Sequence, residues 1–160
     1  MGLRERMASK ALPCLPYRVR IDDTTAAEQA VRDAQGELLL ALGTDREKDA
    51  RLAVEAAGAL LAACFETITL TAMDPDAFEE LVAEHPPREG HPDDEAWNVD
   101  TLPRATFLAC APDFYTPEEW VAWLTKCNSG ERTDLYNAAV AINVRTVSAT
   151  LPKDWTSILS

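Results

Sequence analysis

The pattern of apolar and polar positions predicts helices along most of the chain and two short strands near its start. Residues 17–22 alternate, with Val19 and Ile21 on one side and arginines on the other, which is the period of a half-buried strand. Residues 66–73 alternate in the same way through Ile68. We expect these two segments to pair.

Two amphipathic helices are predicted between the strands. Residues 23–25 offer N-cap oxygens to a helix that ends near Leu42, before Gly43, and Asp45 caps a second helix that runs to about Cys64. The inward stripes are expected to be Ala27, Ala30, Val31, Ala34, Leu38 and Leu42 in the first helix, and Leu52, Ala53, Ala56, Ala57, Leu60, Ala63 and Cys64 in the second. Because the connection is so short, the helices must form an antiparallel hairpin.

Further helices are predicted after residue 73. Asp74 with Pro75 begins a short one, and Thr116-Pro117-Glu118-Glu119 is a capping box that begins another. Two more start near Thr101 and Ser129. Their inward residues are expected to be Phe78, Leu81, Val82, Leu102, Thr106, Phe107, Cys110, Leu135, Ala138, Ala139 and Ile142. The fold class is therefore mainly α: an N-terminal αα-hairpin flanked by two short strands, followed by a small C-terminal helical bundle.

The charge and the breaker residues suggest how the chain is organised. We expect a basic N-terminal arm at 1–16, a single mainly helical domain at 17–145 and a C-terminal tail at 146–160. Within the domain we distinguish the hairpin at 23–65, a C-terminal helical part at 74–145 and an exposed acidic loop at 85–96, which is rich in proline and charge.

Composition supports a helical fold and disfavours some classes of binding partner. The chain has 160 residues with a net charge of -12, and 26 of its residues are alanine, the best helix former. Residues 74–100 hold ten acidic residues and one basic residue, so three-quarters of the net charge lies there. This excess disfavours general binding to nucleic acid or to an anionic membrane.

Nothing at the start of the chain has the apolar core of a signal peptide, and the longest apolar run, 56–65, is half the length of a bilayer span. The four cysteines form no C-x-x-C pair, which is typical of reduced thiols. We therefore expect a cytoplasmic protein.

Candidate chemistry is sparse. His85 and His91 lie near acidic residues, but their spacing matches no established metal-ligand motif, and the common nucleophile, phosphate-loop and dinucleotide motifs are absent from the sequence. A nucleophile at Cys14, Cys110 or Cys127 would need the fold to bring a histidine beside it. We expect no enzyme activity, no metal and no cofactor.

The aromatic residues suggest a partner-binding surface. Trp120 and Trp123 share one helical face, so both can join the core or line an exposed groove. The candidate partner-binding residues are Trp120, Trp123, Trp155, Ile158 and Leu159.

A longer pattern resembles a known family. The segments 66–87 (ETITLTAMDPDAFEELVAEHPP), 96–110 (AWNVDTLPRATFLAC), 116–120 (TPEEW) and 134–145 (DLYNAAVAINVR) resemble the tail assembly chaperones of long-tailed phages and prophages of actinobacteria. The most specific pieces are Glu84-His85-Pro86-Pro87 and Trp97-Asn98-x-Asp100-x-x-Pro103, and the similarity extends over the upstream strand and hairpin. The resemblance implies a mainly helical, non-enzymatic protein that binds the tape measure protein during tail assembly and is generally absent from the finished virion. It supplies no catalytic or ligand residues.

Other readings stay open. A structural virion protein, such as a tail terminator or connector, would order its arm and tail between subunits and remain in purified particles. An acidic inhibitor of a host protein would carry its carboxylates along one face. The sequence also leaves open a homo-oligomer.

Overall fold

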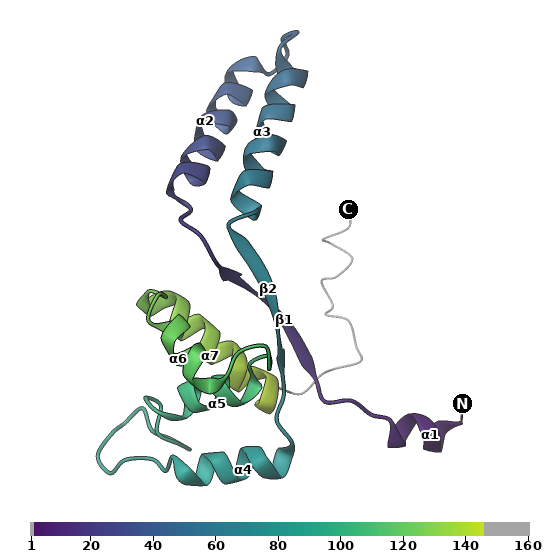
Figure 1. The fold of residues 1–160 in the computed structure, drawn as a ribbon. Helices are drawn as coiled ribbons and strands as arrows, with labels where there is room; N and C mark the ends of the chain where they lie inside the picture. The colour runs from purple at the N-terminus through teal and green to yellow at the C-terminus, as the bar shows by residue number, and fades with distance from the viewer. Residues whose placement is uncertain (1, 146–160) are drawn as a thin grey trace. The chain divides into compact units, whose positions relative to one another are not determined.

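The computed structural model describes residues 2–145. The predicted Trp155, Ile158 and Leu159 lie outside this range. In chain order the elements are α1 (Leu3–Ala8), β1 (Cys14–Arg20), α2 (Thr25–Ala41), α3 (Glu47–Ala62), β2 (Phe65–Thr71), α4 (Pro75–Glu84), α5 (Leu102–Cys110), α6 (Pro117–Leu124) and α7 (Ser129–Val144) (Figure 1). The protein is mainly α with one two-stranded sheet, so the predicted fold class is confirmed.

The two predicted strands pair. The Ala72 N–H donates to the Pro13 carbonyl at 2.8 Å and the Ile21 N–H donates to the Cys64 carbonyl at 2.9 Å, a register that only an antiparallel pair gives. Strand β1 begins three residues earlier than predicted and ends before Ile21. Ile21 is consequently 54% exposed and not inward as expected.

The described chain forms two compact units, one made by residues 16–69 and the other by residues 2–15 and 70–145. The first, the hairpin unit, contains α2 and α3 packed side by side (Figure 1). Gly43 ends α2 with φ of 74°, a left-handed conformation that a side chain disfavours. The predicted cap at Asp45 is wrong, because α3 begins after Arg46 and uses no side-chain cap. Glu47 instead accepts the Gly43 N–H at 2.9 Å, closing the turn.

The helix seam differs from the prediction at one residue beside α2 and at several residues of α3. In α2 the expected residues Ala27, Ala30, Val31, Ala34 and Leu38 are half-buried, and Ala41 is buried. Leu42 was also expected inward, but it follows the helix and is 50% exposed. The buried or half-buried apolar residues of α3 are Ala50, Val54, Ala57 and Leu61, and Cys64, after the helix, is half-buried. Leu52, Ala53, Ala56, Leu60 and Ala63, which were also expected inward, are exposed. Since α3 is apolar around most of its circumference, the period of its sequence does not single out one face.

The second unit, which we call the helical unit, holds the main core. Helix α5 packs against α7, and α4 packs against α5. Its buried apolar side chains are Leu70, Ala72, Leu102, Phe107, Cys110, Trp120, Leu124, Leu135 and Ala139. The predicted inward positions of α5 and the predicted capping box of α6 are confirmed. Helix α1 was not predicted, and none of its residues is buried.

One polar side chain, Asn143 of α7, connects three elements of this core. Its Oδ1 accepts the Met73 N–H at 2.8 Å, and its Nδ2 donates to the Ala139 carbonyl at 2.8 Å and to Cys110 Sγ at 3.2 Å. The end of β2 is thereby fixed to α7 and α5. No helix in the described part of the chain has both the length and the apolar character needed to cross a bilayer.

Candidate partner-binding surface

Trp120 forms the base of an aromatic cluster in the helical unit. Only 3% of it is exposed, and its Nε1–H donates to the Pro112 carbonyl at 3.0 Å. Its ring meets Phe107 of α5 edge-on, with 5.5 Å between centroids. A tryptophan that is buried and has its N–H satisfied contributes mainly to the stability of the fold. The sequence left open whether Trp120 joins the core or an exposed groove, and in the structure it lies in the core.

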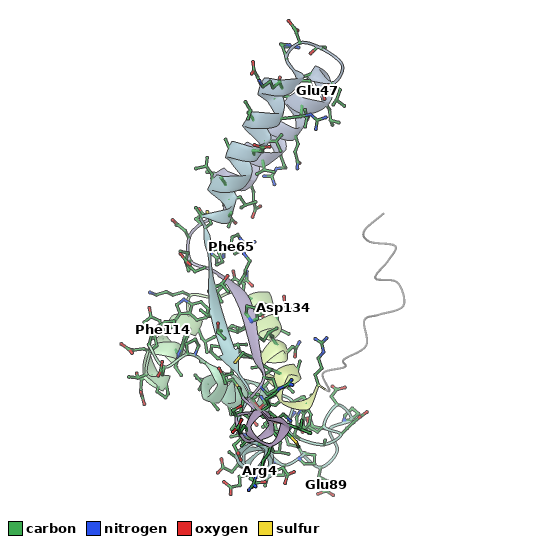
Figure 2. All side chains as sticks on the ribbon, turned by 90° about the vertical axis from the view of Figure 1, so that its right-hand side faces the viewer. Arg4, Glu47, Phe65, Glu89, Phe114 and Asp134 are labelled. Atoms are coloured by element: carbon green, nitrogen blue, oxygen red, sulfur yellow. The ribbon has the colours of Figure 1, made fainter. Side chains whose placement is uncertain are left out.

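Two other aromatic residues lie over Trp120 and reach solvent. Phe114 is 62% exposed and Tyr115 is 40% exposed, with centroids 5.3 Å and 5.0 Å from the Trp120 ring. In Figure 2 the labelled Phe114 lies at the outer edge of the helical unit. Trp123 is half-buried and meets Trp120 edge-on at 5.4 Å. We call Phe114, Tyr115, Trp120 and Trp123 the aromatic patch.

Local sequence explains why the patch is held in place. Thr116 Oγ1 accepts the Glu119 N–H at 3.2 Å and Glu119 Oε2 accepts the Thr116 N–H at 2.7 Å, which is the reciprocal capping box. Tyr115 precedes the cap and Trp120 is the fourth helical residue, so their contact is a hydrophobic staple. These interactions fix the direction in which the chain enters α6. Phe114 takes part in neither the capping box nor the staple, so formation of the helix does not require it. Its exposure is therefore not explained by folding alone.

The sequence prediction located this region but selected its buried members. Trp120 and Trp123 were chosen because of their size and spacing, whereas the exposed residues are the two that precede the cap. The T-P-E-E motif could have located Tyr115, because a hydrophobic staple packs the residue before the cap against the fourth helical residue. No local signal of this kind marks Phe114.

Acidic residues flank the aromatic patch in the sequence. Asp113, Glu118 and Glu119 are exposed and flank the aromatic residues in sequence. Exposed aromatic residues surrounded by polar groups are typical of protein-binding surfaces. This surface suits an apolar partner segment that carries basic side chains at its margins.

The acidic segment 85–100 is organised around one arginine. Arg88 Nε donates to Asp94 at 2.7 Å, its Nη2 donates to the same carboxylate at 3.0 Å, and its Nη1 donates to Asp100 at 2.6 Å. Asp94 also accepts the Arg88 and Val99 N–H groups and is buried. The Arg88 hydrogen bond holds the pKa of Asp94 well below its usual range. The predicted loop is mostly exposed, but Asp94 is not, and this carboxylate fixes the conformation of the loop.

The residues considered for chemistry have structural environments. His85 Nδ1 lies 2.8 Å from Thr101 Oγ1. Within residues 2–145 no cluster of three or more His, Cys, Asp or Glu side chains could hold a metal ion. All four cysteines are free thiols, and burial raises the pKa of Cys110 while the Asn143 contact opposes this shift.

Comparison of the chain with known protein families, with curated proteins and with solved structures finds no match in any of the three.

Proposed function

We propose that this protein is a tail assembly chaperone of a long-tailed actinobacterial phage or prophage, and that it binds the tape measure protein in the host cytoplasm. The observation that carries the proposal is the aromatic patch, in which exposed Phe114 lies on buried Trp120. The family resemblance of the sequence supplies the identity of the client.

The physical requirements of such a chaperone agree with the two surfaces described. It must present an apolar surface to an apolar, coiled-coil-prone client, and it must stay soluble while doing so. The aromatic patch meets the first requirement. The nine net negative charges of residues 74–100 meet the second.

The acidic residues that flank the patch in sequence add selectivity. Acidic side chains beside an apolar surface attract client segments that carry lysine or arginine and disfavour acidic ones. We expect the patch to accept amphipathic helices of the tape measure protein whose apolar face is flanked by basic residues.

Co-expression tests the proposal. The tape measure protein of the same phage is produced with the wild-type chain, with Phe114→Ser or with Leu39→Ser, and its soluble fraction is measured. Leu39 is the matched control, because it is 71% exposed but lies in α2, outside the patch. The wild type and Leu39→Ser should keep the client soluble, and Phe114→Ser should lose most of this effect.

Two further outcomes separate the alternatives. Equal client solubility with all three chains would contradict binding at the patch. Presence of the protein in purified virions, in ring-forming amounts, would favour a structural tail protein over a chaperone. Deletion of residues 146–160 and Trp155→Ala test the part of the predicted site that lies outside the described residues.

A further inference from the structure

A groove crosses the helical unit at the end of α7. It consists of two adjoining clefts with volumes of about 430 Å³ and 110 Å³, which share Pro13, Ile142 and Arg145. The groove is lined by residues 10–15, by residues from the segment 72–79 and by the end of α7, all of which belong to the helical unit. The larger cleft falls in the range of about 300–1,000 Å³ that is usual for binding sites.

Apolar side chains predominate in this groove. Leu12 is 42% exposed, and Met73, Phe78 and Ile142 are half-buried. Asn143 also lines the groove, but its amide group already accepts the Met73 N–H and donates to α7 and α5. The groove therefore suits an apolar, uncharged segment better than a small polar ligand. The charged lining residues are all exposed: Lys10, Glu79 and Arg145.

The chain itself leads into the groove. Arg145 lines both clefts, is the last residue of the described range and has an extended backbone, with φ of -77° and ψ of 127°. Fifteen residues follow it in the sequence, and the first of them is only about 3.8 Å from Arg145 between Cα atoms. A segment linked so closely has an effective concentration in the millimolar range, so weak contacts are enough to hold it. A separate partner lacks this advantage.

The sequence that follows Arg145 fits an extended segment with one apolar side. Residues 146–151 read TVSATL, so hydroxyl side chains alternate with Val147, Ala149 and Leu151. This is the period of a strand that is buried on one face. The six residues carry no charge, as an apolar groove requires. Pro152, which has no backbone N–H, ends the alternation.

We propose that residues 146–151 of this chain bind in the groove as an extended segment, with Val147 and Leu151 against its apolar side chains. The contact holds the start of the C-terminal segment on the helical unit. The residues from Trp155 onwards lie beyond the contact and stay available to a partner. The proposal is independent of the proposed client, because only residues of this chain take part.

Limited trypsin digestion of the full chain tests the proposal. Trypsin cleaves after Arg145, directly before the bound segment, and after Lys153, beyond it. A protease cuts a bound segment only while it is open, so the first bond should be protected and the second should not. Intact mass follows both cleavages at low trypsin concentration. Each rate is divided by the rate for the same bond in a synthetic peptide of residues 140–158, which removes the intrinsic preference of the protease.

Four variants of the full chain locate the contact. Leu151→Ser changes the bound segment, and Ile158→Ser is its control outside that segment. Leu12→Ser changes the groove at a half-exposed position, and Leu3→Ser is its control, because Leu3 is 72% exposed and does not line the groove. Circular dichroism checks that all five proteins are equally helical.

In the wild type we expect cleavage after Arg145 to be at least about tenfold slower than in the peptide. Leu151→Ser and Leu12→Ser should remove most of this protection, and the two controls should keep it. A wild-type rate equal to that of the peptide overturns the proposal, as does protection that either Leu151→Ser or Leu12→Ser leaves unchanged. Protection that is lost on tenfold dilution also overturns it, because the segment would then bind a second copy.

Discussion

Alanine substitutions at Trp120 and at Phe114 distinguish how much the buried base of the patch and its exposed surface each contribute to the stability of the fold. Trp120 is 3% exposed and contacts four other rings, whereas Phe114 is 62% exposed and contacts two. Trp120→Ala removes a buried side chain and leaves the Pro112 carbonyl without its donor, so it should lower the free energy of unfolding by about 3–5 kcal/mol.

The cost of Phe114→Ala is worked from its exposure. Full burial of a phenylalanine contributes about 1.5–3 kcal/mol, and Phe114 hides less than two-fifths of its surface, which gives about 1 kcal/mol. Its ring contacts bring the total to about 1–2 kcal/mol. Urea unfolding followed by circular dichroism measures both variants against the wild type. A loss for Phe114→Ala as large as that for Trp120→Ala would refute the reasoning, because Phe114 would then be part of the core and not a binding residue.

Two further predictions concern the Arg88–Asp94 ion pair and two glycines. Asp94→Asn should lower the melting temperature at pH 7, where Asp94 is ionised beside Arg88. This difference should shrink as the pH falls below about 4, because the unfolded wild-type chain then takes up a proton at the ordinary aspartate pKa, whereas the folded chain keeps Asp94 ionised. Asp93→Asn, at an exposed neighbour, is the control, and an equal loss for Asp94→Asn at pH 7 and pH 3 contradicts a stabilising Arg88–Asp94 ion pair. Gly58→Ala, at an exposed position inside α3, should raise the free energy of unfolding by about 0.5–1 kcal/mol, because alanine favours the helix more than glycine does. Gly43→Ala should lower the free energy of unfolding by about 1–2 kcal/mol, because φ is 74° there. Urea titration measures both variants, and a change of the same sign in both would show the backbone argument to be wrong.

Local signals in the sequence predicted the elements well. The Thr116 capping box, the Asp74 cap with Pro75 and the left-handed Gly43 each depend on residues within a few positions of one another, and all three appear in the structure. The alternation of Ile68 and Leu70 likewise sufficed to place β2, because a strand that is buried on one face has a period of two.

Contacts that depend on the fold could not be read in this way. Residues 56–64 are all apolar except for one glycine, so no period distinguishes the face of α3 that packs on α2 from the exposed face. Arg88 and Asp94 lie six apart in an irregular segment, where spacing carries no information about direction. Asn143 is an ordinary polar residue in the sequence, and only the packing of β2 against α7 gives its side chain three partners.

The candidate site likewise combines residues that the sequence located with residues whose position depends on the fold. The sequence predicted a binding surface among the aromatic residues of the C-terminal half, and it selected Trp120 and Trp123 for it. It did not identify Phe114, because the exposure of one ring depends on how the segment before α6 crosses the buried Trp120.

Isothermal titration calorimetry of the purified protein with the tape measure protein of the same phage tests the central claim most directly. The wild type should bind, Leu39→Ser should bind equally well, and Phe114→Ser should bind at least about tenfold more weakly while unfolding within about 2 kcal/mol of the wild type. Equal affinity of all three proteins, or no binding by the wild type, would contradict the account.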